Sequence, residues 1–262
     1  FGLMLFVAGR SLGIIYFAVP LLSTLVFSLK AERGTYSLTA YRNVLADPQF
    51  LRTFTFSVEI AILTIVFSLL LIVPTVYWVH LKLPQIRPLM EFVAFLPFVL
   101  PAIVLVFGLI RIYSRPPLAL TNTVTTTNFL LVAAYMSLSL PYMYRAVDTG
   151  MRAIDIRTLT EAAQSLGAGW SVIIRKVIFP NLRTALLSGT FLTFAIVIGE
   201  YTIASCLARP MFGPYLANQV RNKAYEPAAL SIISFGLTWA MMAGLQWATH
   251  RTPGAQVTAG PR

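Results

Sequence analysis

The chain has 262 residues, of which 57% are hydrophobic and only 11% are charged, and its formal net charge is +11. A soluble domain carries about a quarter charged residues, whereas a helix needs about 20 apolar residues to cross a bilayer. The composition therefore predicts an integral membrane protein. The basic residues flank apolar runs and form no stripe with aromatics, which indicates contact with anionic lipid and argues against nucleic-acid binding.

The residue types that hold metals and form disulfides are scarce. Cys206 is the single cysteine, so the chain cannot form an intrachain disulfide. His80 and His250 lie far apart in the sequence, and no cluster of Cys and His is present. We therefore expect no metal site and no cofactor bound by this chain.

Six stretches are long and apolar enough to be predicted as membrane-spanning helices within a single transmembrane domain, residues 1–262. They cover residues 11–29, 59–79, 92–110, 128–144, 184–206 and 227–249. Prolines inside the first four stretches predict kinks, which membrane helices tolerate. Kinked apolar helices with small residues predict a packed bundle rather than separate anchors.

The distribution of basic residues suggests an orientation. If residues 145–183 are cytoplasmic, the loops on that side carry 11 of the 20 lysines and arginines, which is a small margin. Six of them fall within 145–183 alone, and this density favours the cytoplasmic side for that connection. Residues 30–58 then form the longest external loop, in which aromatic residues and Asp47-Pro48 predict a short interfacial segment.

Residues 145–183, called the insert below, combine helical periodicity with several charges. Thr158-Leu159-Thr160-Glu161 fits a capping box, in which the hydroxyl and the Glu side chain satisfy backbone donors at a helix start. An apolar stripe follows at helical spacing and consists of Leu159, Ala162, Ala163 and Leu166. Two adjacent alanines in this stripe would let a partner backbone approach closely.

The second half of the insert predicts a bend and another helix. Gly167 stands where a left-handed helix terminus is expected. A second apolar stripe then consists of Trp170, Ile173, Ile174 and Val177. Pro180 is predicted to stop this helix just before the fifth span.

The residues of the insert resemble the signature of a known family. Glu161-Ala162-Ala163, then Gly167, then Val177-Ile178-Phe179-Pro180 resembles the signature of ATP-binding-cassette importer permeases. That signature reads Glu-Ala-Ala, three residues, Gly, nine residues, Ile-x-Leu-Pro; Val177 and Phe179 replace its Ile and Leu with other apolar residues. Weaker similarities, Asp47-Pro48 before the second span and Leu96-Pro97 in the third, resemble the branch that handles polyamines, ferric iron and phosphonates.

The resemblance implies an all-α, six-transmembrane-helix type I permease bundle in the bacterial inner membrane, with a cytoplasmic coupling helix. It assigns coupling to an ATPase to five residues: Glu161, Ala162, Ala163, Gly167 and Pro180. The implied partners are an ATPase dimer, a second permease subunit in a heterodimer or as a copy of this chain, an external binding protein and membrane lipid. ATP and Mg²⁺ would be bound by the ATPase, because this sequence lacks the Gly-x-x-x-x-Gly-Lys-Ser/Thr loop.

Glu161 allows two compatible interpretations, an ion pair with an arginine of the ATPase or completion of its own capping box. Glu200 is the one acid deep in an apolar stretch, and intramembrane carboxylates usually face a bundle interior or a wet cavity. We predict that Glu200 and the adjacent Tyr201 line the translocation pathway or its gate. The alternative is an acid near the outer interface that water reaches.

The sequence thus predicts a non-catalytic permease subunit that moves a small polar solute, with a polyamine as the best match, by alternating access. Phosphonate, ferric iron or another small anion is the alternative solute. An ion-coupled secondary transporter would show internal repeats, and none is found. A membrane-embedded enzyme would need a polar cluster, whereas Glu59 and Glu200 form no catalytic pair by spacing.

Overall fold

The computed structural model describes residues 15–16, 18–32 and 35–250, except for the side chains of residues 245 and 248–250. Within these residues the regular structure is helical, apart from one isolated bridge between Glu32 and Thr35. The first described helix is Ala18–Ser28. The others are α2 (Thr39–Ala46), α3 (Pro48–Lys82), η1 (Pro84–Ile86), α4 (Arg87–Val99), α5 (Ala102–Tyr113), α6 (Val124–Arg152), α7 (Ile156–Ser165), α8 (Trp170–Val172), the π-helix η2 (Ile173–Ile178), α9 (Phe179–Asn181), α10 (Arg183–Gly199), α11 (Thr202–Cys206), α12 (Phe212–Asn222) and α13 (Glu226–His250).

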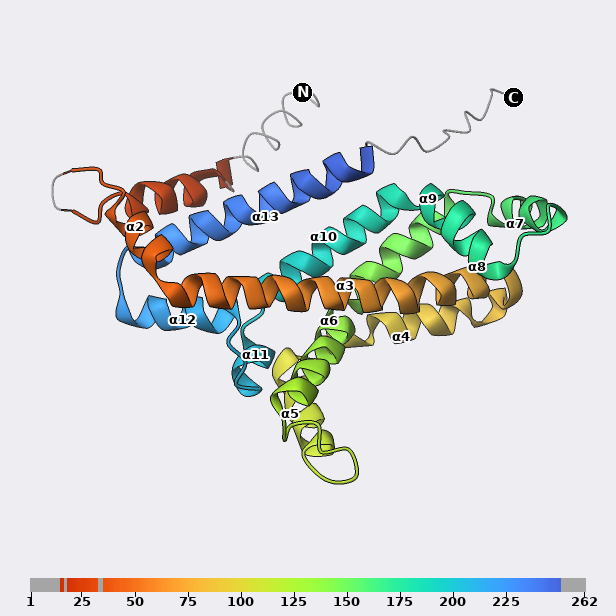
Figure 1. The fold of residues 1–262 in the computed structure, drawn as a ribbon, viewed down its shortest axis with the longest axis horizontal. Coiled ribbons are helices and arrows are strands. Elements are labelled where there is room, and N and C mark those ends of the chain that lie inside the picture. Colours follow the sequence, from red (N-terminus) through yellow and green to blue (C-terminus); the bar gives the residue numbers. More distant parts are fainter. Residues whose placement is uncertain (1–14, 17, 33–34, 251–262) are drawn as a thin grey trace, which may run out of the picture.

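The helices form a bundle in which α3 is the longest element (Figure 1). Helices α7, α8 and α9 gather at one end of the bundle, and α2 and α12 lie at the opposite end. Helix α5 and the beginning of α6 project together to one side, at the bottom of the view. The insert therefore occupies one end of the molecule, well separated from the segments that surround the start of α3.

Helix α3 begins where the sequence offers a strong start signal. The Asp47 carboxylate accepts a hydrogen bond of 2.9 Å from the amide of Gln49, and Pro48 occupies the first turn, where its missing N–H is harmless. The Tyr215 hydroxyl of α12 donates to the same carboxylate at 2.7 Å. With 35 residues at ~1.5 Å each, α3 is roughly 50 Å long and exceeds a ~30 Å hydrocarbon core. Its last turns therefore reach the insert.

Three described helices are long and apolar enough to cross a membrane, and two bent pairs raise that number to five if each pair is one span. Helices α3, α6 and α13 contain the predicted spans 59–79, 128–144 and 227–249. Helix Ala18–Ser28 is the shorter apolar helix within the predicted span 11–29. Residues 11–14 and 17 of that span lie outside the described residues.

The third predicted span, 92–110, is not a continuous helix. Helices α4 and α5 meet at an angle of 100°, far more than the kink that the sequence suggested. The residue before a proline is pushed out of the α region, and Leu100 accordingly adopts φ −91° and ψ 117° ahead of Pro101. Pro97, by contrast, lies inside α4 without ending it.

The fifth predicted span, 184–206, is also broken. Helix α10 ends at Gly199, Glu200 has an extended backbone with ψ 130°, and the short helix α11 follows. Gly213 approaches this break so closely that a Cβ built on it would collide with the carbonyl oxygen of Glu200. Residues 184–206 therefore form two helices, although they are one apolar run in the sequence.

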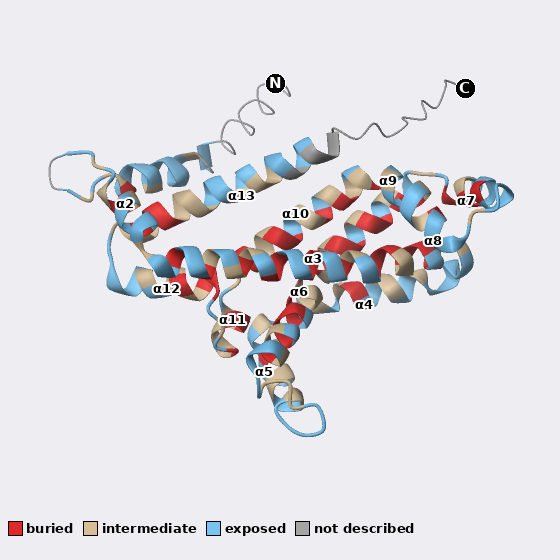
Figure 2. Ribbon diagram, viewed as in Figure 1, coloured by how far each residue is buried: buried red, intermediate tan, exposed pale blue. Residues whose placement is uncertain are grey.

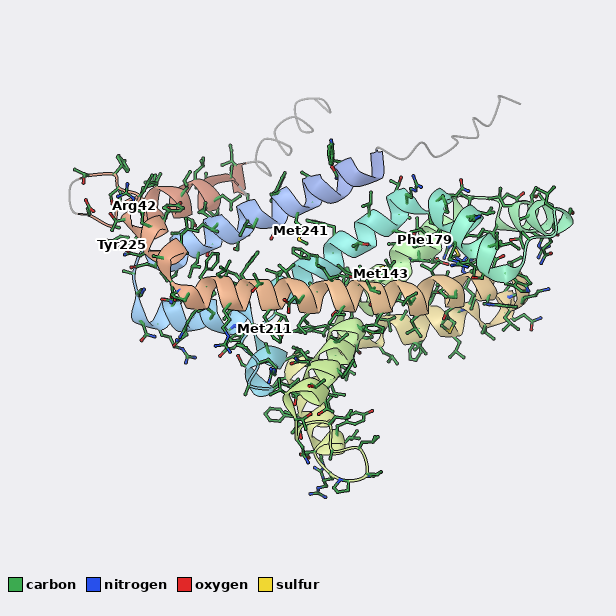
Figure 3. All side chains as sticks on the ribbon, viewed as in Figure 1. Arg42, Met143, Phe179, Met211, Tyr225 and Met241 are labelled. Carbon is green, nitrogen blue, oxygen red and sulfur yellow. The ribbon has the colours of Figure 1, made fainter. Side chains whose placement is uncertain are left out.

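Helix α6 packs against α3 and α10, and small residues set how closely it approaches α10. A Cβ built on Gly150 would lie 2.5 Å from the Cβ of Ala185, and one built on Gly189 would lie 2.9 Å from the sulfur of Met143, which Figure 3 labels. Figure 2 shows buried residues running along α3, α6 and α10. Close approach through small residues is a main source of cohesion between membrane helices, because lipid offers no hydrophobic drive.

Gly150→Ala tests this contact. We expect overpacking of α6 against α10 to lower the free energy of unfolding by about 1–3 kcal/mol, because Ala185 is a short side chain that cannot rotate away. Gly108→Ala in α5 is the matched control, since nothing lies within 4 Å of a Cβ there and the helix should gain up to about 1 kcal/mol. Denaturation in detergent micelles measures both, and equal behaviour of the two variants would contradict the close-packing account.

Candidate functional site

The start of α7 differs from the predicted capping box. The Asp155 carboxylate is the N-cap and accepts hydrogen bonds from the amide of Thr158 at 3.1 Å and from its hydroxyl at 2.7 Å. These bonds hold the pKa of Asp155 below its usual value. The capping box on Thr158 and Glu161 was therefore wrong, because Asp155, three residues before Thr158, supplies a stronger acceptor. Glu161 is exposed and has no part in the cap.

Helix α7 turns one face to the rest of the protein. Ile156, Thr160 and Ala163 are buried on that face, and the hydroxyls of Tyr77 and Thr160 are 2.8 Å apart. Tyr77 belongs to α3 and is completely buried. This bond and the surrounding apolar contacts attach α7 directly to the last turns of the longest helix.

The apolar stripe predicted for α7 is divided between two faces. Ala163 is buried in the cluster that includes Tyr77, whereas Ala162 is exposed to solvent. Leu166, at the end of the same stripe, has 88% of its surface exposed. The exposed residues of α7 and its C-cap are Arg157, Thr158, Glu161, Ala162, Gln164, Ser165 and Leu166.

The predicted left-handed residue after α7 is confirmed. Gly167 has φ +77°, its amide donates to the carbonyl of Gln164 at 2.8 Å, and the amide of Ala168 donates to the carbonyl of Ala163 at 3.0 Å. This is the hydrogen-bond pattern of a Schellman cap. A Cβ on Gly167 would meet no other atom, so the requirement for glycine comes from the backbone angle alone.

The second half of the insert packs on α3 through aromatic residues. The ring of Trp170 lies 5.0 Å from that of Trp78 and 6.2 Å from that of Tyr77. Ile173 and Ile178, five residues apart, are both completely buried because η2 is a π-helix with a wider turn. The predicted helix of 3.6-residue period is thus replaced here by a π-helical turn.

Pro180 lies inside the last helix of the insert, which ends one residue later and, as predicted, just before the fifth span. It lies in the first turn of α9, where a missing N–H is tolerated, and the helix continues to Asn181. The bend of 81° follows at Leu182, between α9 and α10. The insert therefore leads into α10 through a sharp corner rather than through a proline break.

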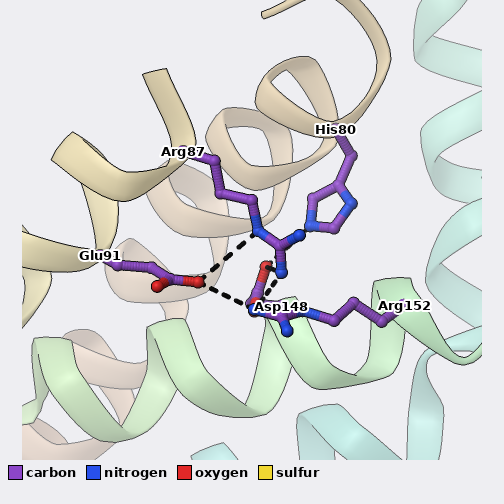
Figure 4. Close-up of polar contacts among 5 residues, drawn as sticks. All are labelled: His80, Arg87, Glu91, Asp148 and Arg152. Carbon is purple, nitrogen blue, oxygen red and sulfur yellow. Dashed lines mark hydrogen bonds and ion pairs between the residues drawn. The ribbon is translucent and has the colours of Figure 1, made fainter. Parts of the chain in front are cut away.

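A cluster of four charged side chains and His80 lies where α3, α4 and α6 meet (Figure 4). Its centre is Asp148, whose side chain is only 2% exposed. One carboxylate oxygen lies 2.7 Å from Nε2 of His80, and the other lies 2.6 Å from Nη2 of Arg152. Nη2 of Arg87 lies 3.2 Å from both oxygens. Asp148 therefore joins the end of α3, the start of α4 and the end of α6.

Glu91 completes the cluster at its exposed edge. Its carboxylate lies 2.8 Å from Nη2 of Arg152 and 3.6 Å from Nε of Arg87. This cluster was not predicted from the sequence. The sequence does show two pairs of opposite charge at a spacing of four residues, Arg87 with Glu91 and Asp148 with Arg152. Nothing in these spacings indicates that α4 and α6 meet.

Glu200 and Tyr201 lie at the break between α10 and α11. The Glu200 carboxylate accepts hydrogen bonds from the amides of Ile203 at 2.9 Å and Ala204 at 3.2 Å, and from the Tyr135 hydroxyl at 3.2 Å. Its carboxylate therefore caps the first turn of α11 and binds α6. Tyr201 is 43% exposed. With 17 residues at ~1.5 Å each, α10 places this break roughly 25 Å from the insert.

The structure is a helical bundle with several apolar spans, and an amphipathic helix is packed firmly against one end of it. Leu166 is exposed at the end of that helix. This is the architecture of a transporter permease. The chain belongs to the family of binding-protein-dependent transport system inner membrane components, which it matches over residues 84–248.

Relatives of known description agree with this family. The chain is 29% identical to a probable molybdenum ABC transporter permease protein of Haloferax volcanii, over 79% of this chain and 74% of that protein. It is 35% identical to the spermidine/putrescine transport system permease protein PotC of Haemophilus influenzae, over 29% of each chain. Its fold matches a chain of a bacterial ABC transporter involved in the import of the acidic polysaccharide alginate, with a TM-score of 0.72, 11% identity and 96% coverage of both chains.

These findings confirm the main predictions from the sequence. The protein has the all-α type I permease fold and is a multi-pass inner-membrane protein. It is the non-catalytic permease subunit of an ABC importer for a small solute, and ATP is hydrolysed by a separate subunit. The family also excludes the two rival classes, a secondary transporter and a membrane-embedded enzyme.

Asp148→Asn tests whether the cluster holds the end of the bundle together. Losing the charge while keeping the shape should lower the free energy of unfolding by about 2 kcal/mol, because the hydrogen bonds to Arg87, Arg152 and His80 lose charge assistance. Glu91→Gln is the control and should lose less than about 1 kcal/mol, because its side chain is 37% exposed. An equal loss in both variants, measured by denaturation in detergent, would contradict the central position of Asp148.

Proposed function

We propose that α7 is the coupling helix of this permease and docks in a groove of the ATPase through Glu161, Ala162, Ser165 and Leu166. The observation that carries the proposal is Leu166, an apolar side chain with 88% of its surface exposed on a helix that is otherwise firmly attached. Ala163 and Gly167 act indirectly, through packing against α3 and through the turn that aims the tip. Pro180 lies in the corner that connects the insert to α10 and takes no part in docking.

Because α7 is attached to the bundle, it can transmit a movement of the ATPase to the membrane-spanning helices. Tyr77 binds Thr160, Trp78 packs on Trp170, and both aromatic residues belong to the last turns of α3. Closure of an ATPase dimer on ATP and Mg²⁺ would pull on α7 and thereby on α3. The permease would then alternate between inward-open and outward-open states.

The complete importer needs further subunits. We propose that this chain pairs with a second permease subunit, two ATPase subunits and an external substrate-binding protein. Much apolar surface on α4 and α5 is exposed, including Phe92, Val99 and Phe107, and it is available to lipid or to the second permease. The five members of the charge cluster would lie at the cytoplasmic end of the bundle.

The solute of this importer is small and polar. A polyamine was predicted mainly from the resemblance to the branch that handles polyamines, and the negative charge of Glu200 would also suit a cation. In the structure the Glu200 carboxylate accepts bonds from Ile203, Ala204 and Tyr135, so its oxygens are turned to its own chain. Among the relatives, PotC matches over only 29% of this chain, and the molybdenum permease matches over 79%. The Glu200 carboxylate is therefore not a reason to propose a cation as the solute.

Leu166→Ser tests the docking surface. The variant should fold normally, because Leu166 contacts little of its own chain, but it should no longer co-purify with the ATPase or respond to its nucleotide state. Leu45→Ser is the control, since Leu45 is 66% exposed on α2 at the opposite end. Co-purification from detergent-solubilised membranes measures both variants. Retention of the ATPase by Leu166→Ser would remove this surface from the proposal.

The orientation is tested by cysteine labelling in intact cells. Ser171→Cys in a Cys206→Ser background should resist an impermeant thiol reagent, because the insert faces the cytoplasm and Ser171 is exposed there. Asn222→Cys, exposed at the end of α12, should react readily in the same background. The reverse pattern of labelling would invert the topology.

A further inference from the structure

Helices α8, η2 and α9 form one segment, Trp170–Asn181, which is called the surface segment below. It meets α10 at an angle of 81°. Helix α10 begins the fifth apolar span, and a segment nearly perpendicular to a spanning helix runs parallel to the plane of the membrane. Figure 1 shows α8 and α9 at the end of the bundle that the insert occupies. The depth of the surface segment is therefore set by its two ends.

Both ends of the surface segment lie where the apolar spans end. At its start, the ring of Trp170 packs on that of Trp78, four residues before Lys82, the last residue of α3. At its other end, Phe179 precedes Arg183, the first residue of α10, by four residues. Tryptophan and basic residues at the ends of spanning helices mark the boundary between the hydrocarbon core and the lipid headgroups. The surface segment therefore lies at headgroup depth.

The surface segment buries one side and exposes the other. Ile173 and Ile178 are completely buried against the bundle. The exposed residues are Trp170, Ser171, Val172, Arg175, Lys176, Phe179 and Asn181. Three of these are apolar, two are basic and none is acidic. Basic residues beside exposed apolar and aromatic ones are typical of a helix that lies in the membrane interface.

Arg175 and Lys176 are not neutralised by an acid of this chain. Within the part of the chain that the structure describes, neither residue forms an ion pair. Residues 162–199 contain no acid. Nε of Arg175 donates to the backbone carbonyl of Ser171 at 3.2 Å, a neutral acceptor that leaves the charge uncompensated. The whole end of the molecule is also basic, since residues 80–91 and the insert carry eight lysines and arginines against four acids.

We propose that Arg175 and Lys176 bind the phosphate groups of anionic phospholipids, and that this contact holds the surface segment on the membrane. A guanidinium and an ammonium both donate charge-assisted hydrogen bonds to phosphate oxygens. Val172 and Phe179, exposed on the same segment, enter the boundary between headgroups and acyl chains, where their apolar surface leaves water. An anionic leaflet attracts each further lysine or arginine that lies near its surface.

Bound lipid would act where movement passes between α7 and the bundle. The surface segment connects α7 to α10, and through Trp170 it packs on the last turns of α3. In the proposed importer the ATPase contacts α7 around Leu166, whereas the surface segment faces lipid. The two surfaces are separate, so the lipid contact does not rest on the docking of the ATPase.

The binding is tested with the purified full chain in nanodiscs of phosphatidylcholine and in nanodiscs of phosphatidylcholine and phosphatidylglycerol in equal parts. The anionic lipid should raise the Tm by about 3 °C. Arg175→Gln combined with Lys176→Gln should lose most of this increase, whereas Arg175→Lys combined with Lys176→Arg, which keeps both charges, should retain it. Arg157→Gln removes an exposed charge from α7 and should respond as the wild type does. No increase in the wild type, or an equal increase in the double glutamine variant, overturns the site.

A depth measurement locates the surface segment independently. A spin label is attached at Val172→Cys or, as the control, at Ser165→Cys on α7, each in a Cys206→Ser background and in the mixed nanodiscs. Collisions with molecular oxygen, which dissolves in the bilayer, are compared with collisions with a water-soluble nickel chelate. The ratio of oxygen to nickel collisions should be higher at Val172 than at Ser165. Equal ratios at the two positions overturn the proposal.

Addition of the ATPase separates lipid from a protein partner. If the ATPase shields the label at Val172 from both reagents, a protein covers this face and the lipid assignment fails. An unchanged ratio at Val172, with shielding at Ser165 alone, supports it. Because the measurements on the chain alone need no ATPase, their failure is distinguishable from failure of α7 to dock.

Discussion

One buried carboxylate, that of Asp148, sits where three helices of the bundle meet. Removing a carboxylate from water is costly unless cations and hydrogen-bond donors surround it. Arg87 and Arg152 supply both, and Nε2 of His80 lies within hydrogen-bond distance. The ends of α3 and α6 and the start of α4 are thereby fixed to one another. Helix α7 begins four residues after Arg152 and is attached to the same end of α3 by Tyr77. The position of the insert therefore depends on this carboxylate.

The positions of most helices could be predicted from the sequence, because apolar runs of membrane length leave the backbone no alternative to a helix. The two breaks could not. Both lie within long, mostly apolar stretches, and hydropathy does not distinguish one helix from two. Pro101 marks the first break, but Pro74, Pro97 and Pro141 lie inside helices that continue. The break at Glu200 packs against Gly213, which only the folded chain brings close.

The candidate site was predicted in part. The bend at Gly167 followed from the residue type, because only glycine readily adopts φ +77° there. The burial of Ala163 and the exposure of Leu166 could not be predicted, since they depend on which face of α7 meets α3. The cluster around Asp148 was missed because its members are as far as 72 residues apart, between His80 and Arg152. Residues that act through tertiary contact leave no local pattern in a single sequence.

The central claim is that α7 and the end of α3 move as one body when the ATPase binds nucleotide. Pulsed electron paramagnetic resonance on the assembled importer tests it most directly. Spin labels at Gln164 and Lys82, both exposed, report the distance within the chain in a Cys206→Ser background. We expect this distance to be the same without nucleotide and with ATP trapped, while the distance between the coupling helices of the two permease subunits shortens. A change within the chain as large as the change between the subunits would contradict the account.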